Sequence, residues 1–302
     1  MNESSSAINK TSWRDYFDLC KPKVVALLLL TAIVGVVLAS PPGEISLFTL
    51  IISTTGIGLA AAAGAAINQI VERESDAKMA RTENRPMPTG KVSQQNAFIF
   101  AVLLATASVF MLTAWINVLT AVLTFASMIG YAVVYTMYLK KATSQNIVIG
   151  GLAGATPPLL GWTSVTDSID PHGLLLVLII YTWTPPHFWA LAIHRRDDYA
   201  KVNLPMLPVT HGIEFTKYSI LGYTILMILV TILPYLAYMQ GLIYLVSALI
   251  LGLYFLYKVM ILMFTERENA AIQTFVYSIN YLMLLFIAMI VDHYYPVYPG
   301  LN

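Results

Sequence analysis

Long uninterrupted runs of apolar residues dominate this sequence and limit what it can fold into. A helix needs about 20 residues to cross roughly 30 Å of hydrocarbon, and nine runs approach that length. They lie near residues 24–40, 46–70, 97–116, 118–138, 147–164, 174–193, 218–239, 242–264 and 273–291. Continuous rather than alternating apolarity selects helices over a barrel, because backbone polar groups in lipid must be bonded internally. We therefore predict an all-α, polytopic membrane protein with nine transmembrane helices in a bundle.

The composition excludes several other classes of protein. Of the 302 residues, 58% are hydrophobic and 11% are charged, whereas a soluble domain carries about 25% charged residues. The net charge of +1 argues against a nucleic-acid partner. A single cysteine, Cys20, excludes an intrachain disulfide, and no Cys/His cluster has the spacing of a zinc site.

The positions of the basic residues predict the orientation of the chain. All 17 Lys and Arg residues fall on one side if there are nine spans, and an excess of Lys and Arg marks the cytoplasmic side. They are Lys10, Arg14, Lys21, Lys23, Arg73, Lys78, Arg81, Arg85, Lys91, Lys140, Lys141, Arg195, Arg196, Lys201, Lys217, Lys258 and Arg267. The opposite side holds Glu44, Asp167, Asp170 and Asp292. We therefore expect a cytoplasmic N-terminus and a C-terminus outside.

The same pattern predicts the domain organisation. We expect one transmembrane domain, 1–302, built from two related four-helix halves and a ninth helix. A cytoplasmic N-terminal segment, 1–22, precedes the first span, and two cytoplasmic catalytic loops cover 71–96 and 194–217. The N-terminal segment contains acidic residues and little Arg, unlike an organellar transit peptide. A bacterial inner membrane is the expected location, with the lipid bilayer as a partner.

The first polar loop begins with three side chains at helical spacing. Asn68, Glu72 and Asp76 occur at i, i+4 and i+8, so a continuing helix would align their oxygens within about 80° of one face. Hard oxygen ligands of this kind suit Mg²⁺, which keeps several waters and shares substrate phosphates. The adjoining Lys78, Arg81, Arg85 and Lys91 supply positive charge for the same phosphates.

The second polar loop carries a smaller acidic cluster. On a helix, His194 and Asp198 would be i, i+4 neighbours, with Asp197 about 60° round from His194. Each cluster closes the second helix of a four-helix set, so both would return to the same membrane side and face each other. Two facing clusters would hold one diphosphate between two metal ions. Charges just beyond a membrane helix are usually solvated caps or topology signals, and the matched pair of loops favours chemistry instead.

Longer strings around these clusters resemble a known family. NQIVERESDAKMARTENRPMPTGKVS (68–93) and TPPHFWALAIHRRDDYAKVNLPMLPV (184–209), together with the number of spans, resemble the intramembrane aromatic prenyltransferase (UbiA-type) superfamily over nearly the whole chain. That superfamily has an NxxxDxxxD first motif and a DxxxD-like second motif. RTENRPMPTG (81–90), TPPHFW (184–189) and LPMLPV (204–209) are similar to its haem-prenylating branch. Glu72 stands where the general first motif has Asp, and His194 stands where the second motif has its first Asp.

The resemblance implies transfer of a farnesyl group from farnesyl diphosphate to a vinyl group of haem b, with water addition, giving haem O for terminal oxidases. The expected cofactor is Mg²⁺, and a downstream haem A synthase or terminal oxidase is an expected partner. The expected catalytic residues are Asn68, Glu72, Asp76 and Asp198, and the expected metal ligands are Asn68, Glu72, Asp76, Asp197 and Asp198. Lys78, Arg81, Arg85, Arg195 and Arg196 are the expected diphosphate-binding residues.

Histidines and aromatic residues leave further candidates. His187 follows Pro185-Pro186 inside a predicted span, and imidazole is a common haem ligand, so it is a haem-binding candidate with His194 and His211. An imidazole bonded to a neighbouring helix would have the same sequence signature. The aromatic candidates for shielding a carbocation, which packing explains equally well, are Tyr131, Tyr135, Tyr138, Trp162, Trp183 and Trp189.

Other functions stay open on the sequence. A secondary transporter would also have two related halves and a proline-broken helix, although its polar groups would lie at the bilayer midplane. A haem-binding assembly factor would explain His187 but not the first motif. A quinone-pathway prenyltransferase acting on an aromatic acid is the nearest competitor.

Overall fold

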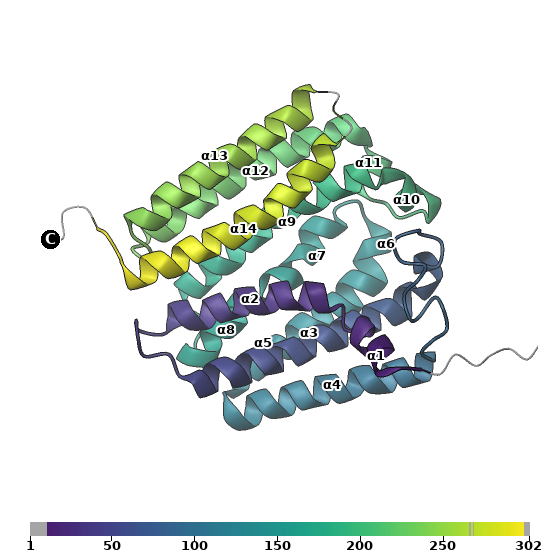
Figure 1. Ribbon diagram of the computed structural model, residues 1–302, viewed down its shortest axis with the longest axis horizontal. Helices are drawn as coiled ribbons and strands as arrows, with labels where there is room; N and C mark the ends of the chain where they lie inside the picture. Colours follow the sequence, from purple (N-terminus) through teal and green to yellow (C-terminus); the bar gives the residue numbers. More distant parts are fainter. Residues whose placement is uncertain (1–10, 266, 268, 299–302) are drawn as a thin grey trace, which may run out of the picture.

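The computed structural model describes residues 11–298 except 266 and 268, and within them it is all-helical, as predicted. Lys10 and the rest of residues 1–10, and residues 299–302, lie outside the described part. The long helices run side by side in one bundle (Figure 1). Their bounds are α1 Trp13–Leu19, α2 Pro22–Ala39, α3 Leu47–Asp76, α4 Gln94–Trp115, α5 Val118–Ile129, the π-helix η1 Gly130–Leu139, α6 Lys140–Ala142, α7 Asn146–Ala155, α8 Pro157–Thr166, α9 Pro171–His194, α10 Arg196–Lys201, α11 Leu207–Thr210, α12 Gly212–Leu236, α13 Leu242–Phe264 and α14 Ala270–Tyr294.

Eight helices in the described residues are long and apolar enough to cross a membrane, so the chain is an integral membrane protein. Eight of the nine predicted runs correspond to these helices, and the fourth of them, Val118–Ala142, joins α5, η1 and α6. The remaining run, 147–164, is divided into α7 and α8, which have 10 residues each. The predicted count of nine continuous spans is therefore not confirmed.

Two prolines cause the division between α7 and α8. Pro157 and Pro158 have no N–H, so the helix loses two backbone hydrogen bonds at this point. In a continuous helix, the N–H of residue 157 would donate to the Ala153 carbonyl. That carbonyl accepts instead from the hydroxyls of Thr156 at 3.0 Å and Ser127 at 3.1 Å. The freed backbone group is thereby satisfied inside the protein, as a broken helix in lipid requires.

Two glycines bring α2 and α8 together at backbone distance. A Cβ added at Gly161 would lie 2.0 Å from the carbonyl oxygen of Ala32, and one at Gly35 would lie 1.9 Å from that of Pro158. Small residues permit such close approach of membrane helices. On α7, Gly151 packs against Thr184, whereas a Cβ added at Gly154 would meet open space.

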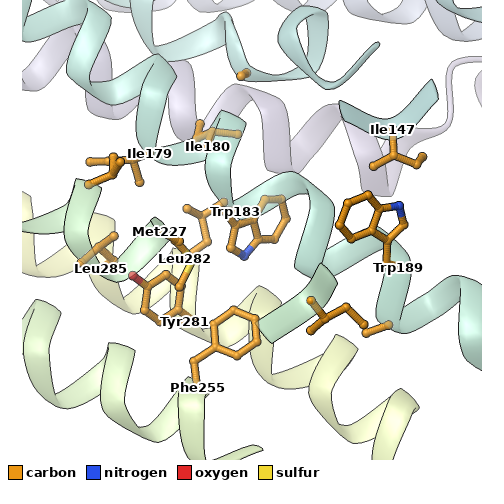
Figure 2. Packing of buried hydrophobic residues seen from close by; sticks show 14 of the residues in the cluster. Ile147, Ile179, Ile180, Trp183, Trp189, Met227, Phe255, Tyr281, Leu282 and Leu285 are labelled. Atoms are coloured by element: carbon orange, nitrogen blue, oxygen red, sulfur yellow. The ribbon is translucent and has the colours of Figure 1, made fainter. Parts of the chain in front are cut away.

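The largest buried apolar cluster lies in the C-terminal half. It joins α9 to α12, α13 and α14, and Figure 2 shows Trp183, Met227, Phe255 and Tyr281 meeting there from these four helices. This packing fixes α9, which leads directly into the second polar loop.

The polar loops gather at one end of the bundle. In Figure 1, α1, α6, α10, α11 and the loop between α3 and α4 all lie at the same end of the long helices. These segments therefore share one end of the bundle, on which the candidate site is built.

Candidate active site

The first motif lies at the C-terminal end of α3, which continues without a break to Asp76. Asn68, Glu72 and Asp76 are 2%, 7% and 1% exposed. The side chains of Asn68, Glu72 and Asp76 therefore form the predicted row of oxygens along one face of α3, which we call the stripe. The stripe is buried, whereas the polar groups of a helix cap would be solvated. Burial of such polar groups is costly unless each has a partner.

Three cations from three different segments meet the stripe, one for each member. The pairs are Lys21 Nζ with Asn68 Oδ1, Lys140 Nζ with Glu72 Oε1, and Arg85 with Asp76 Oδ2. The distance from the Arg85 nitrogen to the Asp76 oxygen is 2.6 Å. Charge-assisted hydrogen bonds of this kind offset the desolvation of buried carboxylates. The site therefore brings buried amide and carboxylate oxygens together with three cations.

The local backbone explains how each cation reaches the stripe. Lys21 has a left-handed backbone, with φ of 51°, immediately before α2 begins at Pro22. Lys140 follows the last turn of η1, and Arg85 lies in the loop after α3. Burial, and secondly the charge of Arg85, lowers the pKa of Lys21 to about 7. An anion beside Lys21 would favour its charged form.

The π-helix η1 orients the Asn68 amide. Asn68 Nδ2 donates to Thr136 Oγ1 at 3.2 Å, and the Thr136 hydroxyl donates to the Tyr131 carbonyl at 2.9 Å. With its nitrogen held by η1, the Asn68 oxygen faces Lys21. Tyr131 and Tyr135 stack beside this link, with their ring centroids 5.8 Å apart.

The donor set fits Mg²⁺. The Oδ1 atom of Asp76 is buried without a hydrogen-bond partner in the described structure, while Asn68 and Glu72 each present an oxygen to a cation. Among the described residues, no group of three or more His, Cys, Asp or Glu side chains is arranged to hold a metal ion. A metal at the stripe would thus take amide and carboxylate oxygens and complete its shell with water and substrate phosphate, which is the usual Mg²⁺ pattern.

The loop after α3 contributes one of its predicted cations to the stripe. Thr82 is fully buried and donates to the Asp76 carbonyl at 2.9 Å, which folds the loop back over the helix end. Arg85 reaches Asp76, whereas Lys78 and Arg81 are exposed. These two residues would need a substrate or a loop movement to act at the site.

The second motif differs from its expected geometry. The helix breaks at Arg195, where φ is −111° and ψ is 21°, so His194 ends α9 and Asp198 lies on the separate helix α10. The expected i, i+4 pairing of His194 with Asp198 on one continuous helix is therefore wrong. Asp198 instead forms ion pairs with Arg195 and Lys201, each at 3.7 Å.

The remaining residues of the second loop also face their own segment or solvent. His194 and Asp197 are exposed, and Arg196 Nε donates to the Pro208 carbonyl at 3.1 Å. One side chain of α10, Tyr199, is buried. The two motifs share one end of the bundle (Figure 1).

The sequence did not identify Lys21 and Lys140 as site residues. Both fit the one-sided distribution of Lys and Arg, and a basic residue beside a membrane helix is common. Their signals were the Lys-Pro step at the start of the first span and the exit of the fourth span at Lys140-Lys141. Neither signal states which distant carboxylate or amide the side chain meets.

The three candidate histidines have different environments. His187 is buried in α9, with 7% of its surface exposed. His211 is exposed, contacts the Thr210 hydroxyl through Nδ1 at 2.8 Å and stacks on Phe215. His194 is exposed at the end of α9.

Comparison with known sequences gives one family. The sequence profile described as the UbiA prenyltransferase family matches residues 28–290. Protoheme IX farnesyltransferase 2 of Pseudoalteromonas atlantica is 58% identical over 289 residues, covering 95% of this chain and 94% of the relative. Protoheme IX farnesyltransferase of Alcanivorax borkumensis is 59% identical, covering 96% of each chain.

Solved structures share the fold at low sequence identity. A digeranylgeranylglyceryl phosphate synthase structure superposes with a TM-score of 0.78 at 19% identity, covering 93% of this chain and 98% of that one. A UbiA homolog from Archaeoglobus fulgidus, bound to DMAPP and Mg²⁺, superposes with a TM-score of 0.64 at 15% identity, covering 91% and 99%.

Proposed function

Because the chain belongs to the UbiA prenyltransferase family, we propose that it transfers a farnesyl group from farnesyl diphosphate to a vinyl group of haem b, giving haem O and diphosphate. The observation that carries this proposal is the 58–59% identity, over nearly the full length, to relatives named protoheme IX farnesyltransferase. The paired oxygens and cations at the end of α3 suit the diphosphate half of that reaction.

The reaction needs charge stabilisation and no protein nucleophile. The C1–O bond of farnesyl diphosphate breaks, and diphosphate leaves with the electron pair. The π-electrons of the haem vinyl group then form a bond to C1, and water adds to the resulting cation and loses a proton. Lys21, Arg85 and Lys140, which are paired with the stripe in this structure, stabilise the charge that develops on the diphosphate. Such preorganised electrostatic stabilisation is often the largest catalytic contribution.

Asn68, Glu72 and Asp76 are the residues that would hold Mg²⁺, and the unpartnered oxygen of Asp76 supports this assignment. When bound there, Mg²⁺ supplies Lewis-acid stabilisation of the leaving diphosphate. Asp198 and Asp197 form a second acidic site on the same end of the bundle, with Arg195 and Arg196 beside it. Lys78 and Arg81 complete the diphosphate-binding set once the substrate is present.

Buried surfaces at this end favour catalysis away from bulk water. The Tyr131–Tyr135 stack lies beside Asn68, where aromatic faces can stabilise a carbocation by cation–π attraction. The haem acceptor would bind through one of His187, His194 and His211.

The cellular setting follows from topology and product. The chain lies in a bacterial inner membrane with its N-terminus in the cytoplasm and its C-terminus outside, which the one-sided distribution of Lys and Arg supports. Its product is a lipophilic haem, so a haem A synthase or a terminal oxidase is the expected recipient.

Detergent-purified protein incubated with haem b, farnesyl diphosphate and Mg²⁺ tests the function by mass spectrometry of the haem. A heavier haem carrying the hydroxyethylfarnesyl group is expected; chelation should abolish it, and added Mg²⁺ should restore it. Prenylation of a hydroxybenzoate or naphthoate, with none of haem, would overturn the haem assignment and leave the family membership intact.

A further inference from the structure

His187 is held on three sides inside the membrane domain. Its imidazole stacks on Trp183, with centroids 4.2 Å apart at 20°, and on Phe275 of α14, with centroids 4.6 Å apart at 28°. Figure 2 shows Trp183 on α9 among the buried core side chains. Two stacked rings fix the plane of the imidazole, and rotation of His187 about its side-chain bonds would disrupt both contacts.

A serine of α14 selects the tautomer of His187. Ser278 Oγ lies 2.6 Å from His187 Nδ1 and donates its own proton to the Phe275 carbonyl, also at 2.6 Å. A hydroxyl has one proton to give, so Nδ1 must carry the hydrogen in the bond to Ser278. The lone pair of the neutral ring is then on Nε2, and no hydrogen bond to Nε2 occurs in the described structure.

The direction of His187 follows from its neighbours on α9. Thr184 packs against Gly151 of α7, and Trp189 packs against Tyr223 of α12. At 100° per residue, His187 is about 60° round the helix from Thr184, and its stacking partner Phe275 is on α14. It therefore lies on the strip of α9 between α7 and α14, away from the α12 interface.

The proposal rests on the function proposed above. We infer that His187 Nε2 binds the iron of the haem acceptor as an axial ligand, and that Ser278 is a positioning residue that fixes the tautomer and direction of the imidazole. A ligating histidine commonly donates its other ring N–H to an oxygen, which orients the ring and raises its basicity. His187 has this arrangement, whereas His194 and His211 are exposed.

Iron ligation would also set the reacting geometry. His187 is seven residues from the cytoplasmic end of α9, about 10 Å along the helix axis. A porphyrin bound there would lie below the polar end of the bundle. Fixing the iron would hold the vinyl group in one place relative to the departing diphosphate.

The test measures haem binding in the absence of farnesyl diphosphate. Wild-type protein in detergent is titrated with haem b, and resonance Raman spectra of the ferrous complex are recorded for an iron–histidine vibration. His187→Ala should remove the vibration, and free imidazole should restore an iron–imidazole vibration by occupying the space that the His187 side chain leaves. Ser278→Ala should retain ligation with a shifted vibration and about 10- to 100-fold weaker haem binding.

Two variants serve as controls. His172→Ala removes an imidazole at the opposite end of α9, and Ser247→Ala removes a hydroxyl that donates to its own helix at Ile243. Both should bind haem like the wild type. If His187→Ala does not fold, the spectral shift in Ser278→Ala decides the question.

An unchanged vibration and affinity in the His187 and Ser278 variants would overturn the ligand assignment, even if the wild type still makes the heavier haem. A wild type that binds no haem b would overturn it as well. Histidine-ligated haem that is never prenylated would leave the ligand assignment standing and contradict the proposed function.

Discussion

Asp76 has two carboxylate oxygens in different situations. One bonds to Arg85, and the other is buried without a partner in the described structure. Asp76→Asn keeps the shape and removes the charge, so we expect turnover to fall about a hundredfold to a thousandfold, the usual cost of one lost electrostatic contact in a transition state. The measurement is turnover at limiting Mg²⁺, with thermal unfolding to verify folding.

A control for Asp76→Asn should remove the charge of a carboxylate without breaking side-chain hydrogen bonds. Asp170, which the sequence places on the far side, accepts from Trp162 Nε1 at 2.8 Å and from Ser168 at 3.0 Å. Asp167 is exposed and has a φ of 50°, which asparagine adopts readily. Asp167→Asn should leave turnover unchanged. Near-normal turnover of Asp76→Asn would reduce the first motif to a structural role.

Lys140 and Lys141 offer a matched pair. Lys140 bonds to Glu72, whereas Lys141 is exposed. Lys140→Gln should raise the KM for farnesyl diphosphate or lower kcat, about 10- to 100-fold in kcat/KM, because one charge-assisted hydrogen bond is lost. Steady-state kinetics with both Lys→Gln variants provide the check. A Lys140 variant that is less stable but kinetically normal would show that the lysine merely neutralises Glu72.

The stripe and its cations differ in how far a single sequence predicts them. The spacing of Asn68, Glu72 and Asp76 sufficed for the stripe, because helical geometry alone aligns residues four apart. The partners Lys21 and Lys140 are 47 and 68 residues away along the chain. Only helix packing brings them to the stripe, and a single sequence does not state which helices are neighbours.

Among the elements, the division of the predicted fifth span is the main difference from the sequence prediction. A hydropathy run measures apolar length and ignores lost backbone bonds, so 147–164 resembled one helix although Pro157-Pro158 lay within it. The break at Arg195 was harder to foresee, since HRRDDY contains neither Pro nor Gly. Continuous helical spacing therefore predicts the wrong position of Asp198 relative to His194.

The close contact between α2 and α8 should make the stability of the protein sensitive to the size of residue 161. Gly161→Ala would place a methyl carbon 2.0 Å from the Ala32 carbonyl oxygen, so the two backbones must separate at a cost of about 3 kcal/mol or more. We expect a much lower thermal midpoint in detergent, or no folded protein. Gly154→Ala, which meets open space, should match or exceed wild-type stability, since alanine favours helix by about 1 kcal/mol. Equal stability of the two variants would contradict the close packing.

The whole molecule places its polar loops at one end, and its orientation in the membrane can be measured. In a Cys20→Ser background, single cysteines at Gly43 and Asp167 should react with an impermeant maleimide from outside. Cysteines within 78–92 or 200–212 should react only after the membrane is opened. The reason is the one-sided distribution of all 17 Lys and Arg residues. Labelling of either basic loop from outside would invert or break the proposed topology.

The pairing of every stripe residue with a cation has a consequence for the order of binding. Lys140 and Arg85 hold oxygens that a metal ion would need, and the same two cations are the ones that a diphosphate would attract. Each ligand thus frees the groups that the other requires, so their affinities are thermodynamically linked and each should strengthen the other by the same factor. The site would then respond weakly to Mg²⁺ alone or to diphosphate alone and strongly when both are present.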